Sequence, residues 1–198
     1  MDSRTRLVEA TQDLLWEQGY SATSPKDIMR RSGAGQGSMY HHFTNKQELA
    51  VVALECSAQS MRQDAEKLLA TDGSAYEIAT AYLRRQRDVL KGCRMGRMTF
   101  DADVLNTPEL IEPVKRTFVW LLEALTVLFE RGRDQGEFAA DIDAHNLASL
   151  VVATVQGGYV LARATRDTDA FDAAVEGAAA LLRKATVPLT TEVSDHSE

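Results

Sequence analysis

The most informative segment of this chain is SPKDIMRRSGAGQGSMYHHF, residues 24–43. At its start, Ser24 can cap the free backbone N–H groups of a helix, and Pro25 fits the first helical position. Asp27 complements the positive end of the helix dipole. Gly33 then allows the left-handed backbone with which a chain leaves a helix and turns sharply. The stretch therefore predicts a short capped helix followed by a tight turn.

A second short helix is predicted directly after this turn, over residues 36–43. Met39 and Phe43, spaced i and i+4, would pack inward. Its outward side would carry small and hydrogen-bonding residues, namely Gln36, Gly37, Ser38, His41 and His42. A third helix, over residues 3–18, precedes the pair. Three helices in this order form a helix-turn-helix unit, whose last helix can enter a DNA major groove about 12 Å wide.

The rest of the chain is predicted to be helical as well, because no sustained alternation of apolar and polar residues occurs. Thr44 with Gln47 matches a capping box, and Pro113 is expected to start a helix rather than interrupt one. The expected helices cover residues 44–70, 74–90, 113–131, 143–163 and 169–185, with breaks at 92–96 and 106–108. An all-α fold follows.

The acidic character of the chain belongs to its C-terminal part. Of the 22 basic and 29 acidic residues, six of each lie in residues 1–50, so the remainder carries the whole net charge of −7. This distribution favours nucleic-acid binding by a small N-terminal unit, residues 1–48, and disfavours diffuse binding by the whole surface. Residues 49–186 are expected to form a larger second unit, and residues 187–198 a disordered tail.

The location of the protein is suggested by three features. Cys56 and Cys93 are far apart and lack Cys-x-x-Cys pairing, which argues against a zinc or iron–sulfur site and fits a reducing cytoplasm. The N-terminus lacks the profile of a secretory signal. The longest apolar stretch, residues 147–162, falls short of the roughly 20 residues that cross a bilayer and is expected to be a buried helix. No membrane, metal or cofactor is expected.

Residues 4–52 resemble the TetR family of transcriptional regulators. The resemblance implies an N-terminal three-helix helix-turn-helix DNA-binding domain and a C-terminal helical domain for ligand binding and dimerisation. Gly35 departs from the family's pattern, in which Ser or Thr usually caps the second short helix, and Met29 and Ser32 stand where Ala is usual. The positions that carry the resemblance are Ala10, Gly19, Tyr20, Thr23, Ser24, Ile28, Gly33, Gly37, Ser38, Met39, Tyr40, His42, Phe43, Lys46 and Leu49.

Eight residues are candidates for DNA binding. The resemblance assigns contacts with bases or nearby phosphates to Lys26, Gln36, Ser38 and His41. It assigns phosphate contacts or a supporting role to Tyr40, His42 and Lys46. Gly37 completes the set. The chemistry agrees, because Gln36 can pair bidentately with adenine and a phenol or an ammonium group suits phosphate.

The helix expected over residues 143–163 is apolar on nearly all sides, which requires burial on all sides. With the Ala-rich final helix it could supply half of a four-helix dimer interface, where the Gly157-Gly158 pair would permit close approach. A core helix within a monomer is the alternative. The resemblance favours a homodimer, whose recognition helices would meet groove faces about 34–36 Å apart, or a multiple of that, on a palindromic operator.

The resemblance also implies a small-molecule effector, expected to be lipophilic and to release the protein from DNA. The candidates for the lining of its pocket are Tyr82, Cys93, Met98, Phe100, Phe118, Trp120, Gln156 and Tyr159. An ordinary core explains most of them equally well. We hypothesise that ligand binding moves the helix from Lys46 to Ala70 and changes the separation of the recognition helices, with a coupling of about 1–3 kcal/mol.

Cys93 supports an alternative, a thiol-based regulator that responds to electrophiles. Lys91, Arg94 and Arg97 are near it in sequence, and nearby cations favour the reactive thiolate. The Gly-Cys-x-x-Gly stretch resembles a branch of the family that includes regulators of electrophile and drug resistance. An inert, partly buried thiol is the simpler interpretation.

Two rival classes lack support. An enzyme acting on a lipophilic substrate would need a catalytic motif, and no Gly-x-Ser-x-Gly elbow, phosphate loop, His-Glu-x-x-His or dinucleotide fingerprint occurs. A purely architectural DNA-binding protein is disfavoured by the net charge of −7. The sequence therefore favours a cytoplasmic transcriptional repressor, with repression taken from what most members of the family do.

Overall fold

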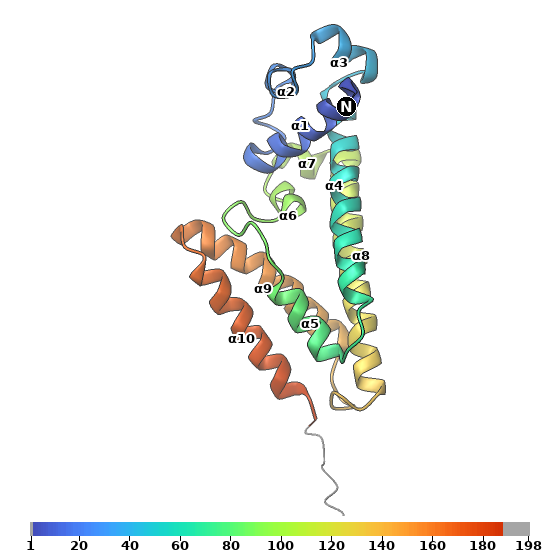
Figure 1. Ribbon diagram of the computed structural model, residues 1–198, viewed down its shortest axis with the longest axis vertical. Coiled ribbons are helices and arrows are strands. Elements are labelled where there is room, and N and C mark those ends of the chain that lie inside the picture. The colour runs from blue at the N-terminus through green and yellow to red at the C-terminus, as the bar shows by residue number, and fades with distance from the viewer. Residues whose placement is uncertain (1, 188–198) are drawn as a thin grey trace, which may run out of the picture.

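The computed structural model describes residues 2–187, and within that range the chain is predominantly helical with no β-strand (Figure 1). The N-terminal helices are α1 (Ser3–Gln18), α2 (Pro25–Ser32) and α3 (Gln36–His42). The helices that follow are α4 (Lys46–Leu69), α5 (Ala75–Arg84), α6 (Arg94–Met98), α7 (Ala102–Asn106), α8 (Pro108–Asp134), α9 (Ala144–Thr165) and α10 (Asp169–Ala185). The prediction of an all-α fold is confirmed.

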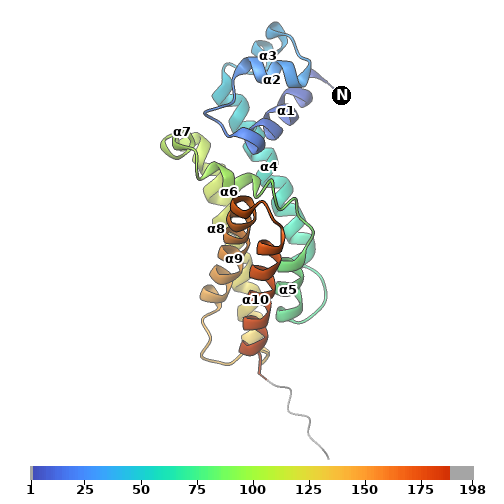
Figure 2. The same ribbon diagram turned by 90° about the vertical axis from the view of Figure 1, so that its left-hand side faces the viewer.

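The molecule is elongated, and its two ends differ (Figures 1 and 2). At one end α1, α2 and α3 gather around the first turns of α4, and at the other lie α5, α9 and α10. α4 and α8 pack side by side and connect the two ends. α9 packs against both α8 and α10. The long α4 therefore joins α3 directly to the C-terminal helices.

Two apolar cores hold this arrangement together. The first joins α1–α4 to α6, α7 and the start of α8, and Ile28 and Met39 are fully buried in it. The second fills the space among α5, α8, α9 and α10, where Phe129 is fully buried. Cys93 and Phe118 pack against both cores. The N-terminal helices are thus packed onto the C-terminal ones rather than attached through a linker.

The predicted end of α5 is wrong. The helix ends at Arg84, not near Leu90, and Arg85 has an extended backbone (φ −55°, ψ 145°). The Arg87 side chain folds back and donates hydrogen bonds to the Leu83 and Arg85 carbonyls at 2.7 and 2.9 Å. These bonds satisfy carbonyls at the helix end that a further turn would otherwise have used. Residues 85–93 therefore form a loop.

Two predicted helix starts are also wrong. α8 begins at Pro108, and Pro113 lies inside it, beyond the free N–H groups of the helix start, so the Glu109 carbonyl receives no N–H from position 113. α4 is capped by Asn45, whose side chain accepts a bond from the Glu48 N–H. Thr44 instead donates its backbone N–H to the Glu48 carboxylate at 2.7 Å.

The C-terminal end of the described chain is attached to the loop after α8. Phe138 and Thr186 form an isolated antiparallel bridge, and the Val187 N–H donates to the Glu137 carbonyl at 2.8 Å. Of the tail expected over residues 187–198, only Val187 belongs to the described residues, and it is held by this bond.

By length and composition alone α9 could cross a membrane, but the core helices of many soluble proteins are equally long and apolar. It packs against both α8 and α10, but its side with Val160 and Leu161 is about half exposed, so the predicted burial on all sides is not found within one protomer. A β-carbon at Gly158 would lie 2.7 Å from the Phe171 ring, so this glycine serves the contact of α9 with α10 within one chain. Gly157 faces open space. Of the predicted glycine pair, only Gly157 is thus free for a partner.

Candidate nucleic-acid interface and adjoining cleft

The turn between α2 and α3 is built by local hydrogen bonds. The Asp27 N–H donates to Ser24 Oγ at 3.2 Å, and the Ser24 N–H and Oγ–H donate to the Asp27 carboxylate at 3.2 and 2.6 Å. The bonds from Ser24 lower the pKa of the Asp27 carboxyl. Gly33 ends α2 in the left-handed region with φ 68°, and Gly35 precedes α3 without a side-chain cap. The predicted capped helix and turn are confirmed.

α3 packs against the protein through two buried side chains, Met39 and the following Phe43, and its other side faces solvent. Met39 is fully buried and Phe43 is 2% exposed, as the i, i+4 spacing predicts. Ser38 and His42 are half-buried. Among the predicted DNA-binding residues, the exposed ones are Lys26 on α2 and Gln36, Gly37, Tyr40 and His41 on α3.

The three basic side chains of α2 differ in whether they form ion pairs with carboxylates of the protein. Arg30 pairs with Asp27 at 2.7 Å, and Arg31 pairs with Glu17 of α1 at 2.6 Å. Lys26 has no ion pair within residues 2–187. It is therefore the α2 cation whose charge no neighbouring carboxylate offsets.

His42 and Lys46 are held by the protein itself. Ser3 Oγ lies 2.9 Å from His42 Nε2. Lys46 Nζ donates to the carbonyls of Tyr20 and Thr23 at 3.1 and 3.0 Å and lies 3.9 Å from the centre of the Tyr20 ring. Burial lowers the pKa of Lys46. Of the two roles expected for these residues, phosphate contact or support, the geometry favours support.

Replacing Lys46 by Met should lower the free energy of unfolding by about 1.5–3 kcal/mol, because the charged hydrogen bonds to two carbonyls are lost while the aliphatic stem is kept. Denaturant unfolding measures this loss. If Lys46 supports the loop between α1 and α2 and does not contact phosphate, the slope of log DNA affinity against log salt should be unchanged in this variant. Unaltered stability together with a slope reduced by about one would instead show a phosphate contact.

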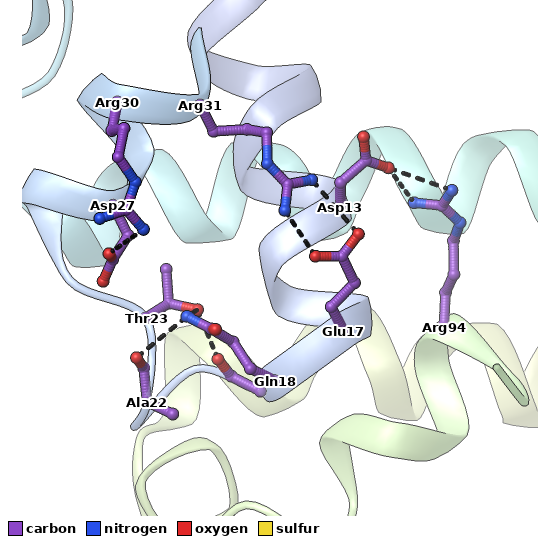
Figure 3. Close-up of polar contacts among 10 residues, drawn as sticks. Asp13, Glu17, Gln18, Ala22, Thr23, Asp27, Arg30, Arg31 and Arg94 are labelled. Atoms are coloured by element: carbon purple, nitrogen blue, oxygen red, sulfur yellow. Dashed lines mark hydrogen bonds and ion pairs between the residues drawn. The ribbon is translucent and has the colours of Figure 1, made fainter.

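α1 is the element to which both α2 and α6 are tied (Figure 3). Arg31 of α2 forms two hydrogen bonds with the Glu17 carboxylate, at 3.2 and 2.6 Å. Arg94 of α6 reaches the Asp13 carboxylate at 3.4 Å. α1 is thus linked by ion pairs to α2 on one side and to α6 on the other.

A cleft of about 640 Å³ opens where the N-terminal and C-terminal helices meet. Its walls come from α4, α5, the loop 85–93, α8 and α9, together with Trp16 of α1 and Arg94 of α6. Of the eight residues predicted to line an effector pocket, the four that line this cleft are Tyr82, Cys93, Gln156 and Tyr159. Burial raises the pKa of Tyr159 to about 12, so its phenol is neutral.

The other four predicted lining residues lie elsewhere. Met98 is fully buried in the first core, and Phe118 packs between the two cores. Trp120 lines a separate groove between α4 and α8. Phe100 is 79% exposed and lies beside Val160 of α9. α6 and α8 instead present Arg94 and Leu121 to the cleft.

The sequence does not predict three residues that line the cleft, namely Trp16, Arg85 and Arg87. The three arginines within residues 84–87 are a signal in the sequence, but a helix continued to residue 90 gives no reason to place them beside a cleft. Trp16 belongs to the helix-turn-helix unit, and only the packing of α1 against α6 brings it to the cleft.

The Gly-Cys-x-x-Gly stretch has a structural explanation. Gly92 has a φ of 81°, and its carbonyl accepts a bond from Trp16 Nε1 at 2.9 Å. Cys93 Sγ accepts the Gly96 N–H at 3.2 Å and so caps α6. A β-carbon at Gly96 would collide with the Gln156 amide. These residues close the cleft against α1 and α9.

The exposed α3, its buried anchors and the capped α2 with its glycine turn together define the class, a helix-turn-helix nucleic-acid-binding protein. The family follows from comparison with known proteins. Residues 7–53 match the family described as "Bacterial regulatory proteins, tetR family", and residues 73–178 match "Tetracyclin repressor-like, C-terminal domain". The chain belongs to the TetR family of transcriptional regulators, as the resemblance predicts.

Individual relatives agree over nearly the whole length. The HTH-type transcriptional regulator YxaF of Bacillus subtilis is 24% identical over 92% of this chain and 96% of its own. A TetR transcriptional regulator from Chloroflexus aurantiacus superimposes with a TM-score of 0.83 and 27% identity, covering 93% of this chain and 96% of its own. A cysteine mutant of the TetR-family regulator CifR, complexed with 26-base-pair double-strand operator DNA, has a TM-score of 0.75 at 20% identity, covering 89% of this chain and 94% of its own.

Proposed function

We propose that this protein is a homodimeric, cytoplasmic transcriptional repressor that binds a palindromic operator through α3 and is released by a small molecule bound in the cleft. The observation that carries the proposal is the exposed α3, whose polar outer side stands on the buried Met39 and Phe43. Gln36 and His41 would meet base edges, and Lys26 would meet phosphate. The operator complex of CifR supports this use of the fold.

The dimer is supported by an apolar face that α9 and α10 leave uncovered. Leu161 of α9 and Leu181 of α10 are 50% and 56% exposed, and Val160 is 52% exposed. The exposed small residues between them are Ala153, Gly157, Ala164, Ala173, Gly177 and Ala180. Small residues let helices approach closely, and an exposed apolar face of this kind is typical of a protein interface. A second copy would form a four-helix contact here.

Release by a ligand is supported by the course of α4. Met61 and Leu68 of this helix line the cleft, while its first residue, Lys46, is bound to the loop between α1 and α2. A ligand that displaces α4 would change the separation of the two α3 helices, for which a coupling of about 1–3 kcal/mol suffices. Trp16 and the Asp13–Arg94 pair offer a second route to the same helices. The thiol-sensor hypothesis for Cys93 stays a prediction.

Titrating the purified protein against its own upstream DNA over a salt series tests this proposal. We expect a saturable, palindromic site bound by two protomers, with an affinity that falls as salt rises. Absence of any preferred site at moderate salt, or a site saturated by one protomer, would contradict it.

A further inference from the structure

The charges that face the cleft are predominantly positive, although the chain as a whole is acidic. The charged lining residues are Lys67, Arg85, Arg87 and Arg94 against Asp64 and Asp88. Lys67 lies 3.9 Å from Asp64, and Arg94 lies 3.4 Å from Asp13. Asp88 lies 3.7 Å from Lys91, outside the cleft lining. Within residues 2–187, this leaves Arg85 and Arg87 without a carboxylate within 4 Å.

Arg87 is the more deeply placed of the two. Its terminal nitrogens donate to the carbonyls of Leu83, Arg85 and Tyr82 at 2.7, 2.9 and 2.5 Å, and its Nε is buried with no hydrogen-bond partner in the described chain. Burial lowers the pKa of this guanidinium. The carbonyls orient the group but do not neutralise it, and a buried charge is stabilised by an opposite charge.

The remaining walls are aromatic and aliphatic. The Arg87 guanidinium lies 5.3 Å from the Tyr82 ring centre, and Arg85 lies 4.7 Å from the same ring. Trp16 and Tyr159 line the cleft with them, together with Leu68, Leu121 and Val155. A cavity of this size suits a molecule of about drug size. The cleft thus combines a cationic end with an apolar body.

We propose that the cleft binds an amphipathic organic anion, with its acidic group against Arg85 and Arg87 and its aromatic or acyl body against Trp16, Tyr82 and Tyr159. This inference rests on the proposed function in assigning the cleft to the effector. It narrows the expected lipophilic ligand to one that carries a carboxylate, sulfonate or similar group. A neutral molecule of the same shape would leave both guanidinium groups without a counter-charge.

A matched pair of fluorescent probes tests the charge requirement. 8-Anilinonaphthalene-1-sulfonate carries an acidic group, and N-phenyl-1-naphthylamine has the same aromatic body without it. In a Trp120→Phe background, Trp16 is the only tryptophan, so energy transfer from it reports probe binding, and the substitutions described next decide whether the cleft is the site. We expect the sulfonate to bind saturably and at least about tenfold more tightly than the amine.

Substitutions then identify the groups responsible. Arg85→Gln and Arg87→Gln should each weaken sulfonate binding about tenfold and leave amine binding within about twofold. Arg84→Gln is the matched control, because Arg84 pairs with Glu176 on the surface, outside the cleft lining. Arg85→Gln removes no side-chain hydrogen bond in the described chain and keeps the test valid if Arg87→Gln fails to fold.

Equal binding of the two probes, or sulfonate binding that neither substitution weakens, would overturn the inference, as would no quenching of Trp16 by the sulfonate. If the two substitutions weaken sulfonate binding but the bound sulfonate does not change the affinity for operator DNA, the ligand class is confirmed and release by a ligand is contradicted. The two failures are therefore distinguishable.

Discussion

Replacing Gly37 by Glu is expected to lower the affinity for operator DNA by about a hundredfold or more and to leave the protein folded. Gly37 lies on the exposed side of α3, and a β-carbon there meets no atom within 4 Å. The new side chain therefore fits the free protein without strain. In the complex, it would bring bulk and a negative charge to the groove and its phosphates. Helix propensity even favours Glu over Gly by about 0.5–1 kcal/mol.

Fluorescence anisotropy with a labelled operator duplex measures the affinity, and thermal unfolding checks the fold. Gly37→Ala is the matched control, which adds only a methyl group and should stay within about tenfold of the parent. An undiminished affinity of Gly37→Glu would show that α3 does not enter the groove.

Substitutions on the exposed face of α9 and α10 are expected to disrupt the homodimer. A double substitution, Leu161→Glu with Leu181→Glu, should convert the dimer to a folded monomer, because both side chains are about half exposed within one protomer and would be buried against a second copy. Operator affinity should fall about a hundredfold or more, since a monomer meets one half-site only. Sedimentation velocity gives the mass, and anisotropy gives the affinity.

Val127→Glu is the control for this substitution. Val127 is 63% exposed on α8 and lines the groove beside Trp120, away from the face of α9 and α10. The control should remain dimeric. If the double variant also remains dimeric, the face formed by α9 and α10 is not the interface.

The helix-turn-helix could be predicted because its signals are local. Ser24 and Asp27 cap α2 through bonds between near neighbours, and Gly33 adopts the left-handed turn without help from distant residues. The inward side of α3 follows from the i, i+4 spacing of Met39 and Phe43. Short-range chemistry of this kind is fully present in the sequence.

The end of α5 and the cleft depend on contacts that the sequence does not display. The Arg87 side chain closes α5 by bonding to carbonyls behind it, and Trp16 reaches the cleft only because α1 packs against α6. These two contacts bring the Arg87 guanidinium and the Trp16 ring to the cleft. The resemblance predicts a lipophilic effector, and only the arginine pair in the cleft narrows that class to an amphipathic anion.

The sequence does not decide whether Lys46 contacts phosphate or supports the protein. Its ammonium group could have faced phosphate or protein, and the decision depends on two carbonyls of the α1–α2 loop. The sequence likewise gives no reason to distinguish Gly157 from Gly158 as a contact with a second copy. In the structure Phe171 of α10 fills the space beside Gly158, and only Gly157 stays open.

Hydroxyl-radical footprinting on the DNA upstream of the gene would show whether two α3 helices read a twofold-symmetric operator. We predict two protected segments related by symmetry and centred about 34–36 Å apart, or a multiple of that distance, with both lost in the Gly37→Glu variant. A single unsymmetrical footprint, or protection that survives the substitution, would contradict the account.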